Sequence, residues 1–289
     1  DWMIERWVDQ FEEEDTLTLC DYFNSPPYID VRLNTSQFEL ELILNMIEKL
    51  GVNWEKSPES NKFIRVKSGV GKLLKSELFK VGMINFQDRA SGAVVELLDP
   101  QKGETILDVC AAPGTKTNYI FERMNGDGHL FASDISSRRL LKGRTRATDL
   151  KLPIKWLQKD ASVDEFPLAD RILIDAPCTG TGVIARRPDI RWRRKVSDFD
   201  NMNIIQTNIL NNMSKYLKPK GTMVYATCSL EKEENWDVVS SFLELNDNFI
   251  INSQNNLIPK EWINNNKCLE IFPPNDKVDG MFAVNIQKI

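Results

Sequence analysis

From about residue 86 to the end of the chain, short apolar runs alternate with segments whose apolar residues repeat at helical spacing. This alternation is typical of parallel strands joined by crossover helices, and it predicts an α/β fold with a mostly parallel sheet. The parallel strands are expected at residues 105–109, 130–133, 154–158, 171–174 and 222–226. Helices are expected over residues 199–217 and 236–245, and KPKG is expected to end the first of them. Antiparallel closing strands are expected near residues 249–251, 268–272 and 281–286.

The part of the chain before residue 86 has a different pattern. Residues 1–25 are expected to form an amphipathic helical linker, because apolar side chains recur at helical spacing from Met3 to Phe11. Residues 26–85 are predicted to form a small α+β domain, and residues 86–289 the large α/β domain. We expect the small domain to present RNA to the large one, with bracing of the large domain as the alternative.

Within the small domain, the runs YIDVRLN and KFIRVK alternate as strands do. Between them, Ser36 and Glu39 have the spacing of a capping box and predict the start of a helix. Gly51 is expected to end this helix. Its apolar stripe is expected to contain Phe38, Leu42, Met46, Ile47 and Leu50.

Composition excludes several classes of protein. The 289 residues are 42% hydrophobic, which is enough to form a hydrophobic core. The sequence has no leader and no long apolar run, so we expect no membrane segment. Because the chain begins with Asp1, we expect a fragment of a longer protein. Five cysteines without close pairs favour a reducing cytoplasm over a disulfide framework. With His129 as the only histidine and no C-x-x-C, no metal site is expected, and nothing demands more than a monomer.

Two cysteines follow apolar runs that are predicted to be strands. Cys178 comes after RILID and Cys228 after MVYAT. In open α/β folds the carboxyl ends of parallel strands carry the chemistry, so both thiols are expected at the same edge of the sheet. One thiol could attack a substrate while the other assists. The pair therefore predicts group transfer onto an electrophilic ring.

The stretch ETILDVCAAPGTKT has the strand, small-residue loop and helix of a cofactor-binding turn. It lacks the G-x-G-x-x-G fingerprint and the ending of a P-loop, which disfavours an NAD oxidoreductase and phosphate binding. Its small residues Ala111, Ala112 and Gly114 would let the backbone approach a flat or sulfonium ligand. Asp134 ends the next predicted strand and suits ribose hydroxyls, while Asp160 ends the third and suits an adenine amino group. Together these features predict a nucleoside ligand.

One segment is strongly basic although the net charge of the chain is −5. In RRPDIRWRRK, five arginines and one lysine surround a single acid, Asp189. The segment also contains Trp192, whose ring could stack on a base. The alternative is a solvated loop, but the position directly after the Cys178 loop favours contact with a phosphate backbone. The predicted RNA-binding residues are Arg186, Arg187, Arg191, Trp192, Arg193 and Arg194.

Several motifs together closely resemble the Sun (Fmu, RsmB) family of RNA cytosine-5 methyltransferases. They are DVCAAPGTKT, SDISSRRL, DAPCTGTGVIARRPDIRW, YATCSL followed by EEN, and DGMFAVNI. The resemblance implies a class I, Rossmann-like S-adenosylmethionine-dependent fold, with Cys228 as nucleophile and Cys178 helping to release the product. Two positions depart from the family pattern, Thr115 in place of a second glycine and Lys232 in place of a proline. The implied cofactor-binding residues are Cys110, Ala111, Ala112, Pro113, Gly114, Thr115, Lys116, Asp134, Arg139, Asp160 and Asp175.

The chemistry of cytosine explains why two thiols are needed. Carbon 5 is too weak a nucleophile to take a methyl group unaided, and a thiolate added to carbon 6 makes it enamine-like. Cys228 would add, and Cys178, alone or through water, would act when the carbon-5 proton leaves. Asp175 is the nearest acid for protonating ring nitrogen 3. Lys116 is the candidate for the positive charge that lowers the pKa of Cys228.

The substrate is expected to be structured RNA, with the target base single-stranded, bulged or flipped out. Ribosomal RNA of the small subunit, 16S, is the first expectation, and transfer RNA is an alternative. A methyltransferase acting on an exocyclic amine would need no nucleophilic thiol. A noncatalytic RNA-binding module of ribosome assembly is the other class of protein that stays open.

Overall fold

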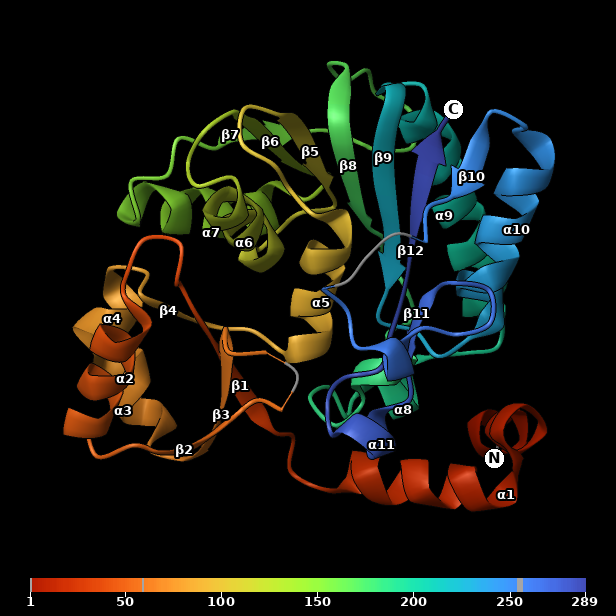
Figure 1. Cartoon of the computed structure of the whole chain (residues 1–289). Helices are drawn as coiled ribbons and strands as arrows, with labels where there is room; N and C mark the ends of the chain where they lie inside the picture. Colours follow the sequence, from red (N-terminus) through yellow and green to blue (C-terminus); the bar gives the residue numbers. More distant parts are fainter. Residues whose placement is uncertain (1, 59, 254–256) are drawn as a thin grey trace.

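The computed structural model describes residues 2–58, 60–253 and 257–289. A long first helix, a small domain and a large α/β domain follow one another along the chain (Figure 1). In the described part of the chain, none of the helices is both long and apolar enough to cross a membrane.

The first helix, α1 (Trp2–Asn24), lies along the base of the large domain (Figure 1). It contains a kink at Glu12, whose φ of 66° is not helical. Its buried side chains Met3 and Trp7 pack in one cluster with Ile184 and Ile190 of the large domain. The amphipathic helix predicted for the start of the chain is therefore confirmed, and it packs on the large domain.

The small domain is a four-stranded antiparallel sheet in the order β2-β3-β1-β4, with helices that bury its apolar face. The predicted strands at YIDVRLN and KFIRVK are confirmed as β1 and β3, whereas two short strands, β2 and β4, were not predicted. The elements are β1 (Ile29–Leu33), α2 (Leu40–Lys49), β2 (Asn53–Lys56), β3 (Phe63–Ser68), α3 (Val70–Lys75), α4 (Glu77–Lys80) and β4 (Ile84–Phe86).

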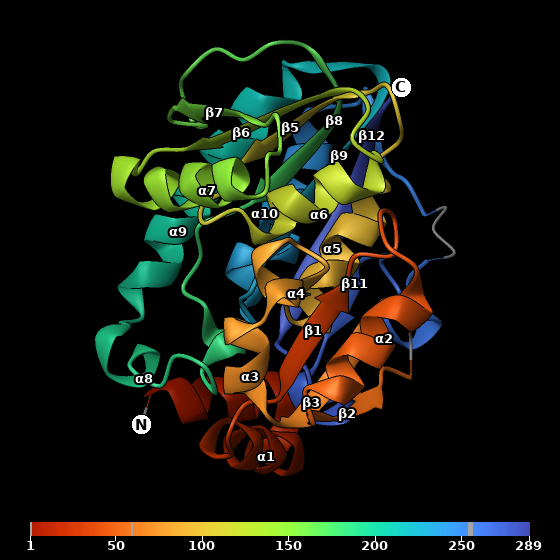
Figure 2. The same cartoon turned by 90° about the vertical axis from the view of Figure 1, so that its left-hand side faces the viewer.

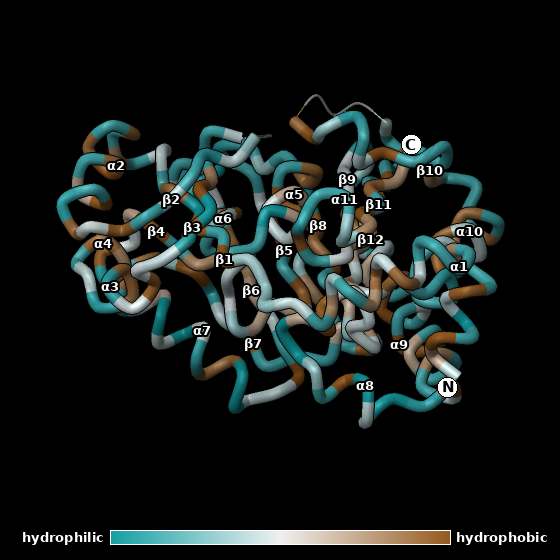
Figure 3. The backbone as a smooth tube through the Cα atoms, turned by 90° about the horizontal axis from the view of Figure 1, so that it is seen from below, coloured by the Kyte–Doolittle hydropathy of each residue, from teal (hydrophilic) through white to brown (hydrophobic). Residues whose placement is uncertain are grey.

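The start of α2 differs from the prediction. The Ser36 hydroxyl donates to Asn34 Oδ1 instead of capping the helix, and Glu39 is itself the N-cap, without a side-chain capping bond. Because α2 begins at Leu40, its buried face centres on Ile43 and Ile47, and Leu42 is 50% exposed. The capping box and the place of Leu42 in the stripe were therefore wrong. Figure 3 shows hydrophobic and hydrophilic turns alternating along α2.

The large domain contains an eight-stranded sheet. Its main path is β10-β12-β9-β8-β5-β6-β7, and β11 pairs with β12. The neighbouring strands β9, β8, β5, β6 and β7 run parallel to one another. β12 pairs antiparallel with β9, β10 and β11, which confirms the predicted closing strands. The strands are β5 (Thr105–Val109), β6 (His129–Asp134), β7 (Lys155–Gln158), β8 (Ala169–Asp175), β9 (Leu217–Thr227), β10 (Phe249–Ile251), β11 (Leu269–Ile271) and β12 (Met281–Lys288).

KPKG belongs to β9 and does not separate a helix from a strand. The preceding helix ends at Ser214, and pairing of β9 with β8 begins at Leu217 opposite Ala169, with a shift of register before Arg171. Lys220, with a φ of 63°, lies in this irregular part. The strand is therefore longer than the apolar run that predicted it.

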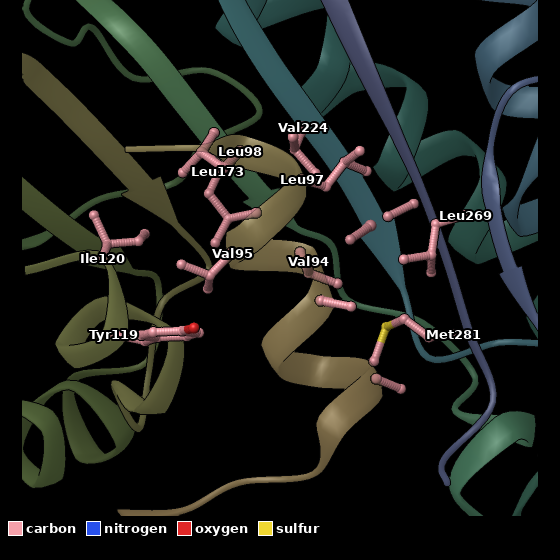
Figure 4. Close-up of a cluster of buried hydrophobic side chains, with 14 of the residues drawn as sticks. Val94, Val95, Leu97, Leu98, Tyr119, Ile120, Leu173, Val224, Leu269 and Met281 are labelled. Atoms are coloured by element: carbon pink, nitrogen blue, oxygen red, sulfur yellow. The ribbon is translucent and has the colours of Figure 1, made fainter. Parts of the chain in front are cut away.

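Helices cover both faces of the large sheet. On one face, α5, α6 and α7 pack against side chains such as Ile106 and Ala132; on the other, α9 and α10 pack against Ile172 and Met223. Figure 4 shows α5 placing its apolar side chains between α6 and the strands. The helices are α5 (Arg89–Leu98), α6 (Thr115–Arg123), α7 (Ser137–Asp149), α8 (Ile190–Arg193), α9 (Ser197–Ser214), α10 (Trp236–Leu245) and α11 (Pro273–Asp276), with short 3₁₀ turns η1 (Thr181–Val183), η2 (Lys232–Glu234) and η3 (Lys260–Trp262).

Buried ion pairs fix the small domain to the large one. Arg32 of β1 is fully buried and pairs with Glu122 of α6. Asp30 of the same strand pairs with Arg65 of β3 and Arg89 of α5. Figure 2, in which the small domain faces the viewer, shows β1 in front of α5, which it contacts. Breaking such a buried pair leaves an uncompensated charge, so the two domains are held in one arrangement.

Candidate active site

The two predicted thiols lie next to each other. Cys178 is in the loop after β8 and Cys228 is in the loop after β9, and these strands are parallel neighbours in the sheet. Their carboxyl ends therefore meet, and the two Sγ atoms are 3.3 Å apart. Both side chains are half-buried, so each is reachable from the edge of the sheet.

The two thiols differ in their tendency to ionise. The hydrogen bond with Cys178 lowers the pKa of Cys228, while the same contact, together with burial, raises the pKa of Cys178. Protonated Cys178 can therefore donate a hydrogen bond to the Cys228 sulfur. This asymmetry makes Cys228 the better nucleophile, because the thiolate is the reactive form of cysteine.

A half-buried ion pair lies beside Cys228. Lys116 Nζ, from the first turn of α6, is 2.9 Å from the Asp175 carboxylate at the end of β8. Burial opposes the charge of Lys116, but the attraction of Asp175 raises its pKa, so the lysine stays protonated. After the hydrogen bond from Cys178, the charge of Lys116 is a further influence that lowers the pKa of Cys228.

Replacing Lys116 by methionine is expected to raise the pH at which Cys228 reacts. Loss of the positive charge raises the pKa of Cys228, and the unpaired Asp175 then adds to this by repelling the thiolate. The rate of Cys228 alkylation by iodoacetamide, measured against pH, should shift to higher pH by about one unit. The exposed Lys142 of α7 provides the control, and its replacement by methionine should leave the profile unchanged. An unshifted K116M profile would contradict this role.

The loop between β5 and α6 has the tight geometry expected of a cofactor turn. Cys110 and Gly114 adopt left-handed φ values of 61° and 101°. A Cβ on Gly114 would lie 2.9 Å from the Trp156 ring, so glycine is required there for a second reason. Thr115 is the first residue of α6 and does not have a positive φ, so its side chain causes no strain at the position where the family usually has glycine.

Three carboxylates lie at the ends of successive parallel strands. Asp134 ends β6 and accepts hydrogen bonds from the backbone N–H groups of Ala112 and Ser136, at 3.2 and 2.9 Å. Asp160 follows β7 and accepts from the N–H and hydroxyl of Ser162, at 2.9 and 2.6 Å. Asp175 ends β8. These oriented acceptors beside a small-residue loop fit the hydroxyl and amino donors of a nucleoside such as S-adenosylmethionine.

Arg139 and Pro113 complete the predicted cofactor set. The Arg139 guanidinium donates to the Ala112 carbonyl, and its Nη1 is 3.6 Å from the Asp134 carboxylate. The peptide bond before Pro113 is cis. Both residues therefore belong to the wall formed by the loop and the end of β6.

Cys110 of this loop and Asp108 at the end of β5 are both strongly affected by burial. Burial, followed by neighbouring carboxylates, raises the pKa of Cys110, so its thiol stays protonated. Asp108 is fully buried beneath the loop, and its carboxylate accepts a hydrogen bond of 2.5 Å from the Thr117 hydroxyl. Burial raises the pKa of Asp108 to about 7. Asp108 thus supports the loop from inside the sheet.

The predicted basic segment is divided in its contacts. Three of its arginines bind other parts of the protein. Arg186 pairs with the carboxylates of Asp88 and Asp279, Arg191 donates to the carbonyl of Phe23, and Arg194 donates to the carbonyls of Cys178 and Thr179. By contrast, Arg187 and Arg193 are exposed, Arg193 with an ion pair to Asp189 inside the segment, and Trp192 is 84% exposed. Arg187, Trp192 and Arg193 therefore face solvent.

Sequence reasoning missed a buried acid behind the thiols. Glu234 is fully buried and accepts hydrogen bonds from Thr179 and Ser229, the residues that follow the two cysteines. In the stretch EKEEN it looks like an ordinary surface charge, and only the place of EEN shortly after the second thiol was a signal. The loop around Gly280 was also missed: its N–H donates to the Gly182 carbonyl at 2.9 Å, next to the Cys178 loop.

Comparison with known proteins identifies the family. Residues 95–287 match the family described as 16S rRNA methyltransferase RsmB/F, and residues 1–71 match a ferredoxin-like domain of RsmF/B-like methyltransferases. The probable ribosomal RNA small subunit methyltransferase B of Synechocystis sp. is 30% identical over 295 residues, covering 100% of this chain and 66% of that protein. The ribosomal RNA small subunit methyltransferase B of Photorhabdus laumondii is 33% identical over 301 residues, with the same coverage of both proteins. The chain thus spans just under two thirds of these relatives.

Solved structures agree in fold. The crystal structure of PH0851 matches with a TM-score of 0.91 at 28% identity, covering 99% of this chain and 65% of that chain. NSun6 from Pyrococcus horikoshii, solved with SFG, matches with a TM-score of 0.87 at 20% identity, covering 99% and 97%. The expected class I, Rossmann-like fold is confirmed, as is the resemblance to the Sun family. The chain is a member of the RsmB/F family of 16S rRNA methyltransferases.

Proposed function

We propose that this protein transfers a methyl group from S-adenosylmethionine to carbon 5 of a cytosine in RNA, with 16S ribosomal RNA as the first candidate. The observation that carries the proposal is the thiol pair, with Sγ atoms 3.3 Å apart at the carboxyl edge of the sheet. Methylation of an exocyclic amine needs no thiol, whereas attack by carbon 5 needs a nucleophile on carbon 6. The three strand-end carboxylates and the loop of residues 110–116 would hold the methyl donor.

In the first step, the Cys228 thiolate adds to carbon 6 of the ring while ring nitrogen 3 takes a proton from the Asp175 carboxyl group. Asp175 and Lys116 lie beside Cys228, and they form the polar wall against which nitrogen 3 and the neighbouring carbonyl oxygen would be held. Carbon 5 of the adduct is then an enamine carbon and can accept the methyl group that the sulfonium cofactor supplies. Holding the reacting atoms in line contributes about 7–11 kcal/mol by orientation.

In the second step, the proton on carbon 5 leaves and the bond between carbon 6 and sulfur breaks, so that Cys228 returns as a thiolate. Cys178 lies within hydrogen-bond distance of Cys228. It can donate its hydrogen bond to the departing thiolate, which stabilises the leaving group. A water molecule takes the carbon-5 proton, because the Cys178 thiol keeps its own proton. Ring nitrogen 3 returns its proton to Asp175, and the enzyme and the methylated RNA separate.

The test of this proposal is the identity of the methylated nucleoside. The protein, incubated with labelled S-adenosylmethionine and small-subunit ribosomal RNA, should yield 5-methylcytidine after digestion of the RNA to nucleosides. A label in N4-methylcytidine would instead support the exocyclic-amine reaction, and the absence of label in any RNA would support a noncatalytic assembly role. Transfer RNA, used in a parallel reaction, distinguishes the alternative substrate.

The exposed basic residues are proposed to bind the RNA backbone. The double variant R187E/R193E is expected to weaken RNA binding and to lower its salt dependence, by about 0.7 in the logarithmic slope for each single-strand phosphate that the protein no longer neutralises. W192A should weaken binding without changing that slope, because stacking is not electrostatic. Titrations of labelled RNA at several salt concentrations measure both effects.

The matched control is K102E/K220E, which changes the charge by the same amount. Both lysines are exposed and lie near the amino-terminal ends of β5 and β9, at the edge of the sheet opposite the thiols. This variant should bind RNA as the unaltered protein does. Equal loss of RNA binding in both double variants, or loss of cofactor affinity in R187E/R193E, would contradict the assignment of the exposed basic residues.

A further inference from the structure

A single buried carboxylate is bound to both thiol loops. Glu234, at the end of η2, accepts hydrogen bonds from the Thr179 N–H at 2.8 Å, from the Thr179 hydroxyl and from the Ser229 hydroxyl. Gln206 of α9 donates a fourth, at 3.1 Å. Because Thr179 follows Cys178 and Ser229 follows Cys228, this one side chain contacts the neighbour of each thiol.

Further hydrogen bonds join the same two loops. The Ser229 hydroxyl is 3.3 Å from the hydroxyls of Thr179 and Thr181, and the Thr181 hydroxyl accepts from the Leu230 N–H at 2.9 Å. The Gly182 N–H donates to the Cys228 carbonyl at 3.0 Å. A shift of either loop would therefore break several bonds at once, and Glu234 is the acceptor at the centre of this network.

The charge of Glu234 is not neutralised by a partner. In the parts of the chain that the structure describes, no cation forms an ion pair with Glu234, and its four bonds come from neutral donors. Burying an unpaired carboxylate costs free energy that a neutral residue such as glutamine would not cost. The negative charge acts on the nearer thiol: after the hydrogen bond with Cys228 and burial, Glu234 is among the groups that raise the pKa of Cys178.

We propose that Glu234 is a positioning residue that holds the two thiol loops at their working separation and keeps Cys178 as the hydrogen-bond donor and Cys228 as the acceptor. The inference rests on the proposed function, because it matters only where one thiol attacks and the other assists. The charged groups that act on Cys228, namely Lys116, Asp175 and Asp279, are separate from Glu234. Glu234 thus contributes, through Cys178, to the choice of which of the two adjacent cysteines is the nucleophile.

Two substitutions separate geometry from charge. E234Q keeps the shape: its amide oxygen can accept from the Thr179 N–H and from Gln206, and its amide N–H groups can donate to the two hydroxyls. E234D keeps the charge but is one methylene shorter, so it cannot reach both loops. The control is E233Q, which removes a charge from the adjacent residue, whose carboxylate forms a partly buried pair with Arg6.

The first readout is the ratio of Cys228 to Cys178 alkylation by iodoacetamide, measured for each cysteine by peptide mass spectrometry at neutral pH without RNA. The ratio should favour Cys228 in the unaltered protein and in E233Q. In E234Q it should fall about tenfold, as expected for a change of one pKa unit, because the charge that keeps Cys178 protonated is gone. In E234D, where the charge remains but the loops shift, the ratio should fall less than in E234Q.

The second readout is methyl transfer. E234D should lower kcat by about a hundredfold with little change in the KM for RNA, because displacing a reacting group affects the chemical step. If E234Q keeps the alkylation ratio and E234D keeps kcat, Glu234 is only structural and the inference is overturned, even if the melting temperature falls. If E234D does not fold, the ratio in E234Q decides alone.

Failure of the proposed function is distinguishable from failure of this inference. Alkylation is measured in the protein without RNA, so it reports the ranking of the two thiols whether or not cytosine is methylated. An unaltered protein that methylates another atom, but whose thiol ranking depends on Glu234, would overturn the proposed reaction and leave the positioning role supported.

Discussion

Replacing Cys228 by alanine or serine is expected to lower the rate of methyl transfer by a factor on the order of 10⁴–10⁶, comparable with the loss of a catalytic nucleophile elsewhere. Without a thiolate on carbon 6, carbon 5 of cytosine remains a poor nucleophile. The initial rate of label transfer to RNA measures the effect. Cys228 is half-buried at the end of a strand, and serine fits the same space, so the fold should persist.

The control for this experiment is C20S. Cys20 is a half-buried cysteine of α1, on the helix that packs at the base of the large domain, and its replacement removes a thiol without touching the site. C20S should transfer methyl groups at the unaltered rate. A C228S protein whose rate stays within a few-fold of the unaltered protein would mean that no sulfur–carbon bond is formed.

Replacing Cys178 by alanine is expected to arrest the reaction after methyl transfer. The thiol that assists elimination is lost, so the covalent complex between Cys228 and the methylated RNA should accumulate and be visible on a denaturing gel. The same substitution removes the hydrogen bond that lowers the pKa of Cys228. Adduct formation should therefore become faster as the pH rises through the higher pKa of the remaining thiol.

The double variant C178A/C228A provides the internal control, since it should form no adduct at any pH. Steady-state turnover of C178A should fall by roughly 10²–10⁴, the usual contribution of a group that handles protons in the transition state. A C178A protein that turns over at the unaltered rate and shows no adduct would place the release step on another residue.

The fold was largely predictable because most of its strands can be recognised from the local pattern of apolar residues. The runs that end at Val109, Asp175 and Thr227 are apolar on both faces, as strands covered by helices on two sides must be, and their order along the chain implies a parallel sheet. The short strand Asn53–Lys56 was missed because its side chains are mainly polar and exposed. Its pairing with β3 is a tertiary effect that local pattern does not contain.

The candidate site was predictable only in part. The sequence indicates that Cys178, Cys228, Asp175 and Lys116 lie at one edge, because each follows the end of a predicted strand or opens the next helix. It does not indicate which side chains pair. Arg186 looks like a cation for RNA in its basic surroundings, yet its partners Asp88 and Asp279 come from distant parts of the chain.

Glu234 illustrates the same limit for a buried acid. Because three of its neighbours in EKEEN are charged, the sequence indicates a solvent-facing turn at Glu234. Burial of a carboxylate is rare unless specific donors surround it. Those donors, Thr179, Ser229 and Gln206, come from three separate segments. Only the folded arrangement of β8, β9 and α9 brings them together.

The most direct measurement uses RNA that contains 5-fluorocytosine at the target position. Fluorine cannot leave carbon 5 as a proton does, so an adduct formed by thiol addition is trapped after methyl transfer. Digestion of the trapped complex and peptide mass spectrometry should place the nucleotide on Cys228 and on no other cysteine. Absence of a covalent complex while ordinary RNA is methylated, or attachment at Cys178, would contradict the account.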